Sequence, residues 1–202
     1  MKKRKLLIGL TGNIASGKST VGKILKEKGI AVIEADRIGW KILERKEIKK
    51  EIQDAFEETN KEGKIDRKKL GNIVFSDRRK LEKLNAIVHP LLLQKLKEEI
   101  EKRKDNIIVV NAALIFEWGI EKWFDKIILV TAEKENRIDR LLKNNLSRKG
   151  AIQRINSQMD EREKVKKSDI IIKNNGTLKG LKKKTLNVIQ EIAQYINSAP
   201  KS

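Results

Sequence analysis

The chain carries the spacing of a phosphate-binding loop, Gly-x-x-x-x-Gly-Lys-Ser/Thr, in the segment Gly12-Asn13-Ile14-Ala15-Ser16-Gly17-Lys18-Ser19. The apolar run before the loop, Lys5-Leu6-Leu7-Ile8-Gly9-Leu10, predicts a buried strand. After the loop, Val21, Ile24 and Leu25 recur at helical spacing. A strand, a glycine-rich loop and a helix N-terminus together form an anion site, because backbone N–H groups and the helix dipole both favour negative charge.

The polar residues at the end of this loop have distinct chemical roles. The Lys18 ammonium reaches the β- and γ-phosphates of a bound nucleotide, and the Ser19 hydroxyl is a ligand for Mg²⁺. Backbone N–H groups of the loop surround the phosphates. We therefore predict a nucleoside triphosphate site formed by Gly12, Asn13, Ile14, Ala15, Ser16, Gly17, Lys18, Ser19 and Thr20.

A GTPase is one protein class that uses such a loop. The segment Asp36-Arg37-Ile38-Gly39 matches Asp-x-x-Gly, but it follows the loop too closely to leave space for a first switch segment. The guanine-reading Asn-Lys-x-Asp is missing, because Asn60-Lys61-Glu62-Gly63 lacks the final Asp. The sequence therefore argues against a GTPase.

Strand and helix patterns alternate along the chain, which predicts an α/β fold with a parallel sheet covered on both faces. The predicted strands are Lys5–Leu10, Ile30–Glu34, Ile107–Val110, Lys126–Thr131 and Asp169–Ile172. A long, mostly helical segment lies between the second and third of them, and we expect Ser76 to cap one of its helices. Thr177 marks the start of the last helix, and Asp160-Glu161-Arg162-Glu163 predicts a break between two short helices.

The bulk composition limits the possible classes of protein. A length of 202 residues fits one domain, and the absence of Cys excludes disulfides and thiol chemistry. No apolar run approaches the ~20 residues that span a bilayer, so we expect a cytoplasmic protein without a membrane partner. The net charge of +19 has three explanations: a nucleic-acid partner, a polyanionic substrate, or a solvated lysine-rich surface. Charge alone does not choose among them, and the oligomeric state is left open.

Asp36 is the first candidate for catalysis, because it follows the second predicted strand. Ligands of open parallel sheets bind beyond the carboxyl ends of the strands, where the phosphate loop also emerges. A carboxylate there can orient an acceptor hydroxyl and take its proton. The alternative is that Asp36 caps the helix that begins at Arg37, and position alone does not decide between the two.

Other polar residues have a functional and a structural interpretation each. Glu117 and Asn111 flank the end of the third strand and are candidates for metal or substrate contacts, or for capping. His89 lies among apolar residues, where a packed core role is the more common one. Arg140 and Arg154 lie on helical stretches after the fourth strand; they either stabilise the charge of a transferred phosphoryl group or belong to a solvated basic face.

The order of these motifs resembles that of the dephospho-coenzyme A kinase family over nearly the whole chain. The resemblance includes the loop with Leu10-Thr11 and Thr20, and Glu34-Ala35-Asp36 in place of Asp-Ala-Asp. The long helical segment and the region beyond it match at Gly63-Lys64-Ile65-Asp66-Arg67, Leu70, Val74-Phe75, Leu84-Asn85, His89-Pro90, Leu114-Ile115-Phe116-Glu117, Arg140-Leu141, Arg154-Ile155-Asn156-Ser157-Gln158, Lys164, Asp169 and Asn174-Asn175-Gly176.

This resemblance implies a P-loop nucleotide-kinase-like, three-layer α/β fold with a five-stranded parallel sheet. Its parts would be a core (1–37, 105–142 and 165–202), a helical insertion that binds the coenzyme A moiety (38–104) and a lid (143–164). It implies ATP-dependent phosphorylation of the 3′-hydroxyl of dephospho-coenzyme A with Mg²⁺, the last step of coenzyme A synthesis, and no nucleic-acid partner.

The resemblance also assigns expected roles to individual residues. Lys18, Asp36 and Arg140 would be catalytic, with Asp36 oriented toward the acceptor hydroxyl. Arg140 and Arg154 would serve the ATP phosphates and the adenine side, and Asn175 and Gly176 would lie near the base. The substrate contacts would come from Asp36, Phe75, His89, Leu114 and Glu117.

Several residues depart from the family pattern. Asn13 and Ala15 replace glycines at variable loop positions, and Asn111 stands where the family commonly has Asp. Further departures are Glu34 for Asp, Ala113 for Pro and Asn144 for Arg. An amide at 111 lacks the charge of a carboxylate near Mg²⁺. The alternatives are therefore another small-molecule nucleotide or nucleoside kinase of the same fold, or a nucleic-acid-binding P-loop ATPase.

Overall fold

The computed structural model describes residues 5–61 and 64–198 of the chain. Five strands form one parallel sheet in the order β2-β5-β1-β6-β7, with bounds Leu6–Thr11 (β1), Ala31–Glu34 (β2), Ile107–Asn111 (β5), Lys126–Thr131 (β6) and Ile170–Lys173 (β7). All five predicted strands are confirmed, and their ends differ by no more than one residue from the expected bounds. Because β1 is central, the loop after it emerges at the middle of the sheet's carboxyl edge.

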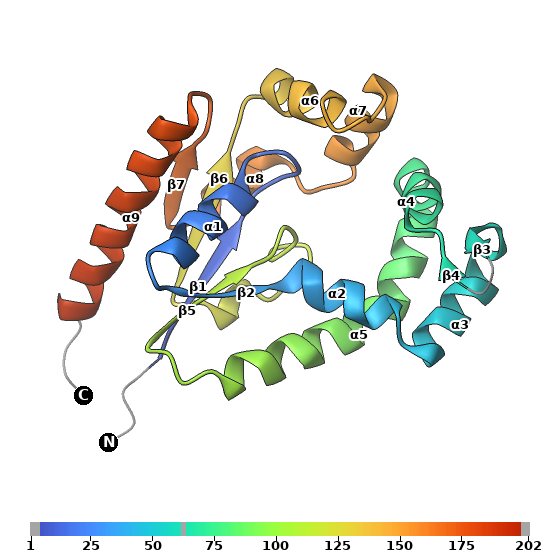
Figure 1. Cartoon of the computed structure of the whole chain (residues 1–202), viewed down its shortest axis with the longest axis horizontal. Helices are drawn as coiled ribbons and strands as arrows, with labels where there is room; N and C mark the ends of the chain where they lie inside the picture. Colours follow the sequence, from blue (N-terminus) through green and yellow to red (C-terminus); the bar gives the residue numbers. More distant parts are fainter. Residues whose placement is uncertain (1–4, 62–63, 199–202) are drawn as a thin grey trace.

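Helices cover both faces of this sheet, as the sequence predicts (Figure 1). On one face, α1 (Lys18–Glu27) and α9 (Leu178–Ser198) pack Val21, Leu25 and Val188 against the strands. The Thr177 hydroxyl accepts a hydrogen bond from the Gly180 N–H, so α9 begins where the sequence predicts. The other face is covered by the long helix α5 (Arg78–Lys102) and by the segment after β5, which contains the short helix η2 (Glu121–Trp123).

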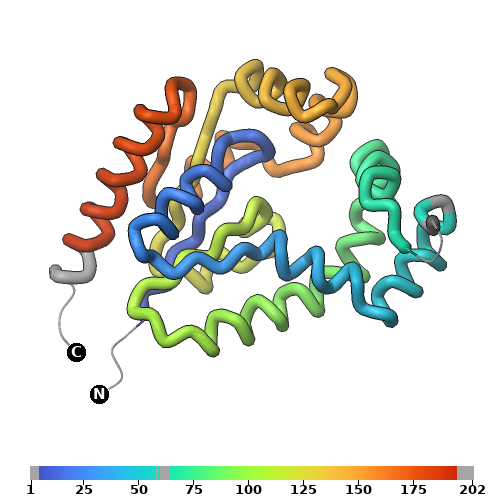
Figure 2. The backbone as a smooth tube through the Cα atoms, viewed as in Figure 1, coloured from blue at the N-terminus to red at the C-terminus, as the bar shows by residue number. Residues whose placement is uncertain are grey.

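Between β2 and β5 the chain forms a second, smaller hydrophobic core built around Ile52, Phe56, Leu70 and Val74. Its elements are α2 (Ala35–Leu43), α3 (Lys46–Ala55), η1 (Glu57–Thr59), β3 (Asn60–Lys61), β4 (Lys64–Ile65), α4 (Arg67–Ser76) and α5. The antiparallel pair β3-β4 is not anticipated by the sequence. Figure 2 shows α3 and α4 of this part beyond the end of α2, away from the sheet.

The prediction that Ser76 caps a helix is wrong. Ser76 is the last residue of α4, and its hydroxyl donates to the carbonyl of Ile73. Asp77 caps α5 instead, because its carboxylate accepts a hydrogen bond from the Arg79 N–H. The two adjacent residues are both good capping types, so the pattern identified the helix but not its first residue.

Three short helices, α6 (Lys134–Leu142), α7 (Arg148–Asn156) and α8 (Glu161–Lys166), connect β6 to β7. The predicted break is confirmed, since the Asp160 carboxylate accepts a hydrogen bond from the Arg162 N–H at the start of α8. Ile138, Leu141, Ala151 and Ile155 form a small core between α6 and α7.

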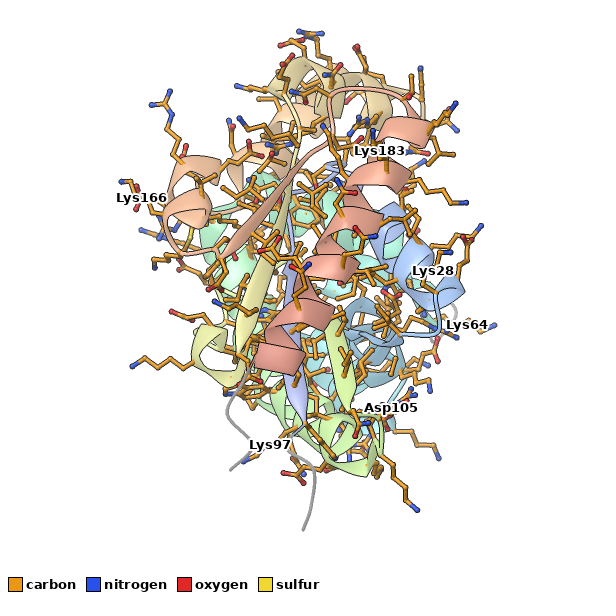
Figure 3. The ribbon with its side chains drawn as sticks, turned by 90° about the vertical axis from the view of Figure 1, so that its left-hand side faces the viewer. Lys28, Lys64, Lys97, Asp105, Lys166 and Lys183 are labelled. Carbon is orange, nitrogen blue, oxygen red and sulfur yellow. The ribbon has the colours of Figure 1, made fainter. Side chains whose placement is uncertain are left out.

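The surface is rich in lysine. Figure 3 shows lysines from several elements, among them Lys28, Lys97 and Lys166, all of them exposed. Among residues 5–61 and 64–198, no helix has the length and apolar composition that crossing a bilayer requires.

Candidate functional site

The loop between β1 and α1 is shaped by two glycines. A Cβ atom on Gly12 would collide with the Val130 carbonyl oxygen, and one on Gly17 would collide with the Asn174 side-chain nitrogen. Gly17 also has φ 101°, a conformation that other residues rarely adopt. Ala15 adopts φ 61° without being glycine, so the loop contains one strained residue between its two glycines.

The back of the loop is held by side chains from distant segments. The Arg140 guanidinium donates to the carbonyl oxygens of Ala15 (2.9 Å) and Ser16 (3.3 Å), and also to that of Asn174 (2.8 Å). The Asn174 amide donates to Ser16 as well (2.7 Å), and Arg137 donates to the Ile14 carbonyl (3.1 Å). These hydrogen bonds hold the carbonyl groups of the loop and leave its N–H groups free of these side chains. The loop is thereby organised before any nucleotide arrives.

Lys18 lies in the first turn of α1 and is only 8% exposed. Its ammonium donates to the Asn111 side-chain oxygen (2.7 Å) and lies 3.9 Å from an Asp36 carboxylate oxygen. Burial lowers the pKa of Lys18, while the carboxylates of Asp36 and Glu34 oppose that shift. The neighbouring Ser19 is exposed in the same turn.

Asp36 lies in the first turn of α2, and its side chain is 57% exposed. The helix begins at Ala35, so Asp36 is inside it and does not act as its cap. The capping interpretation is therefore wrong. An exposed carboxylate next to the lysine of a phosphate loop is in a suitable position to meet an acceptor group.

Residues of the segment between α7 and α8 contact the outer part of the loop. The Gln158 side chain accepts a hydrogen bond from the Ile14 N–H (2.7 Å), and the Asn13 amide donates to the Met159 carbonyl (3.2 Å). Glu117 accepts from the Met159 N–H (3.0 Å) and pairs with the fully buried Lys164 at 2.8 Å. Glu117 thus has structural partners in this arrangement.

Arg154, Phe75, His89 and Leu114 lie apart from the loop contacts just described. The Arg154 guanidinium covers the Phe75 ring at 5.1 Å and thereby connects α7 with α4. The His89 ring meets Trp118 edge-on at 5.7 Å, and partial burial lowers the pKa of His89. The Leu114 carbonyl accepts from the Trp118 N–H (2.8 Å) in the segment after β5.

Asn175 and Gly176, the residues expected near the base, follow β7. The Asn175 amide donates to the Glu133 carboxylate (2.9 Å), and its oxygen accepts from the Glu133 N–H (2.8 Å). Gly176 is exposed, and an added Cβ would have no neighbour within 4 Å. Open backbone at this edge leaves room for a ligand.

Several residues that contact the loop, among them Arg137, Asn174 and Gln158, were not predicted as site residues. Arg137 is 4% exposed and lies three residues before Arg140, so helical spacing alone was a usable signal for it. Asn174 contacts the loop directly, while the prediction chose its neighbours Asn175 and Gly176. The contact of Asn174 depends on how β7 ends, which no local pattern encodes.

A family model described as dephospho-CoA kinase matches residues 6–180 of the chain. The chain belongs to the dephospho-CoA kinase family. A dephospho-CoA kinase from Fusobacterium nucleatum is 45% identical over 182 residues, which cover 89% of this chain and 94% of the relative. The chain is therefore a kinase, and its fold is that of P-loop kinases.

Solved structures agree with the membership in the dephospho-CoA kinase family. A protein from Thermus thermophilus is similar with a TM-score of 0.79 and 35% identity, covering 94% of this chain and 99% of that one. The dephospho-CoA kinase from Campylobacter jejuni has a TM-score of 0.65 and 34% identity, covering 93% and 97%. The resemblance seen in the sequence is thus confirmed at the level of family and fold.

Proposed function

We propose that this kinase transfers the γ-phosphoryl group of ATP to the 3′-hydroxyl of dephospho-coenzyme A and so completes coenzyme A. The observation that carries this proposal is the pairing of Lys18 with Asp36 at 3.9 Å beside the braced phosphate loop. The family membership supports the identity of the acceptor. The absence of Cys and the family are consistent with action in the cytoplasm.

In this proposal the loop binds the triphosphate through its N–H groups, and Lys18 moves from Asn111 to the β- and γ-phosphates. Asp36 orients the acceptor hydroxyl and accepts its proton as the new O–P bond forms in line with the leaving ADP. Arg140 acts mainly by fixing the carbonyl groups of Ala15 and Ser16, which keeps the N–H groups available.

The residues present are compatible with Mg²⁺. Within the described residues no three acidic, histidine or cysteine side chains gather as a metal site, so a dedicated protein cage is not the expected arrangement. Mg²⁺ in kinases is held through substrate phosphates and one or two protein ligands, and the exposed Ser19 hydroxyl next to the loop fits that role. When bound, Mg²⁺ neutralises charge on the phosphates.

We assign the remaining predicted residues by their surroundings. The segment 38–104 would bind the acceptor, with Phe75 and His89 on its helices, and the segment 143–164 would act as the lid. Arg154 would leave Phe75 to approach ATP when the lid closes. Leu114 and Glu117 would line the acceptor side, and Asn175 and Gly176 the adenine side, where Gly176 is open.

A panel of acceptors tests this function. We expect ADP release to be stimulated by dephospho-coenzyme A and not by nucleosides, nucleoside monophosphates or RNA. Stimulation by a nucleoside or a nucleoside monophosphate would favour a different small-molecule kinase. Steeply salt-dependent RNA or DNA binding without any acceptor-stimulated turnover would favour a nucleic-acid-binding ATPase.

A further inference from the structure

Trp40 is an exposed aromatic side chain on α2, and the roles assigned so far do not involve it. Its exposed fraction is 46%, and it is the aromatic member of a set of exposed large apolar side chains that also contains Leu142, Val165, Ile171 and Leu178. Single exposed apolar residues are common on protein surfaces and need no function by themselves. Two further observations distinguish Trp40 from the others.

The first observation is that the indole ring is held in place. The Arg67 guanidinium carbon lies 4.3 Å from the ring centroid, which is a cation–π contact. Arg67 is fixed in turn by the Glu44 carboxylate at 2.6 Å. Glu44 directly follows α2 and lies four residues after Trp40, so the two side chains are on the same side of this helix. Arg67 covers one face of the indole, and the remaining exposure leaves ring surface open to solvent.

The second observation is the position of Trp40 relative to Asp36. The two residues are four apart on α2, so they share a face of the helix and lie about one turn, ~5.4 Å, apart along its axis. The Asp36 carboxylate lies 3.9 Å from the Lys18 ammonium, so this face of α2 is turned toward the phosphate loop. The ring is therefore the next large side chain beyond the carboxylate on that face.

The other faces of α2 are used differently. Ile38 and Ile42 lie on the side of α2 that faces α5 and the sheet edge, and together with Arg37 and Lys41 they line a cavity of about 350 Å³. Neither Asp36 nor Trp40 lines that cavity. The orientation of α2 thus separates the side that lines this cavity from the face that carries Asp36 and Trp40.

We propose that Trp40 is a binding residue whose open face stacks on the adenine ring of the acceptor. This inference rests on the proposed function, in which Asp36 meets the 3′-hydroxyl of an adenosine. Adenine is joined to the same ribose, only a few bonds from that hydroxyl, so a hydroxyl at Asp36 brings the base within reach of the next helical turn. The rest of the acceptor is a ribose, a diphosphate and a flexible arm of amides and methylene groups, none of which offers an indole a flat surface as large as that of the base.

The layered order Arg67, indole, adenine has a physical basis. Stacking of a nucleobase on an aromatic side chain contributes measurably to affinity, and the contact needs only the flat faces of the two rings. A ring that already contacts Arg67 on one face loses less side-chain freedom when the base arrives than a ring without such a neighbour. Trp40 touches the acceptor but not the reacting atoms, so it should affect binding rather than the chemical step.

The test compares Trp40→Ala, Trp40→Leu and Trp40→Phe with the unchanged protein. Leucine keeps apolar volume without a flat π-face, and phenylalanine keeps the face. We expect Trp40→Ala and Trp40→Leu to raise KM for dephospho-coenzyme A by roughly 5- to 150-fold, with kcat and KM for ATP nearly unchanged. Trp40→Phe should retain most of the affinity. Ile171→Ala, at a similarly exposed site on β7, is the matched control and should behave like the unchanged protein.

Binding of fragments identifies which part of the acceptor meets the ring. In the presence of a saturating non-hydrolysable ATP analogue, AMP carries the base and 4′-phosphopantetheine carries the arm. The proposal requires that Trp40→Leu weakens AMP binding and leaves 4′-phosphopantetheine binding unchanged. The reverse pattern, or equal KM values for dephospho-coenzyme A in Trp40→Leu and Trp40→Phe, overturns it.

This result can be separated from the outcome for the proposed function. If the unchanged protein shows no turnover with dephospho-coenzyme A, the proposed function fails before Trp40 is considered. If the unchanged protein turns over and the Trp40 variants keep its KM, only the stacking role fails. Comparison of the leucine and phenylalanine variants keeps the test valid even if the alanine variant does not fold.

Discussion

The ammonium of Lys18 lies 2.7 Å from the side-chain oxygen of Asn111, at the end of the neighbouring strand. The amide nitrogen of Asn111 donates to the Glu34 carboxylate at 2.6 Å, and Glu34 also pairs with Lys26 at 2.6 Å. Because an ammonium only donates and a carboxylate only accepts, the orientation of the amide is determined by its two partners. Asn111 thus separates Lys18 from the nearest carboxylate of β2.

This arrangement predicts the effect of an aspartate at position 111. Asn111→Asp places a carboxylate between Lys18, which attracts it, and Glu34, which repels it, and we expect the repulsion by Glu34 to lower the free energy of unfolding by about 1–3 kcal/mol. Glu34→Gln combined with Asn111→Asp leaves one carboxylate at the site and should recover most of that loss. Urea unfolding at neutral pH measures both effects. Equal stabilities for Asn111→Asp and the double variant would contradict the arrangement.

The exposed carboxylate of Asp36 should matter for turnover and little for nucleotide affinity. Asp36→Asn removes the group that we propose takes the proton of the acceptor, and we expect kcat to fall by about 10²–10⁴-fold. The dissociation constant for ATP, measured by calorimetry without acceptor, should remain close to that of the unchanged protein. Asp54→Asn, on the exposed side of α3, is the control. Full turnover in Asp36→Asn would remove Asp36 from the mechanism.

The left-handed conformation of Ala15 predicts that glycine is better tolerated there than alanine. An L-residue in this region costs about 1–2 kcal/mol, and glycine adopts it freely. We expect Ala15→Gly to raise the free energy of unfolding by about 0.5–1 kcal/mol, after the greater freedom of glycine in the unfolded chain is subtracted. Gly17→Ala should have the opposite effect, because its Cβ would meet Asn174. Thermal unfolding of both variants measures whether the free energy of unfolding rises in Ala15→Gly and falls in Gly17→Ala.

The lowered pKa of His89 predicts a contribution to the pH dependence of stability. Burial makes the folded protein bind the imidazole proton less readily than the unfolded chain does. This contribution to stability is therefore complete above a pH of about 6.5 and is lost as the pH falls through the lowered folded value. His89→Asn should lack it. The chain has one histidine, so comparing urea midpoints of the two proteins at several pH values isolates the effect. If the urea midpoints of the two proteins change with pH in parallel, burial does not shift the pKa of His89.

Much of the fold follows from local patterns. The strands are continuous Ile- and Val-rich runs that end at polar residues, so both their number and their bounds are predictable. The phosphate loop is a contiguous sequence motif, and the strand pattern before it and the helix pattern after it support its assignment. Asp36 was a candidate because it follows a strand of a parallel sheet, and its capping alternative needed coordinates to be excluded.

Contacts between distant segments were not predictable in the same way. Arg137 and Asn174 reach the loop from more than a hundred residues away in the sequence, and the contact of Arg67 with Trp40 requires α4 to fold back on α2. Asp77 rather than Ser76 caps α5 because α4 extends through Ser76. In each case the deciding interaction joins elements whose relative position the pattern does not specify.

The side chains that support the phosphate loop, Arg140, Asn174 and Gln158, all come from the final third of the chain. During synthesis the loop leaves the ribosome first, while the residues that shape it are still untranslated. A nascent chain that ends before residue 137 would contain the complete motif without the side chains that hold its carbonyl groups. The order of translation thus places the motif and the groups that brace it at opposite ends of the polypeptide, and the loop acquires its full set of contacts only when the last strand has been made.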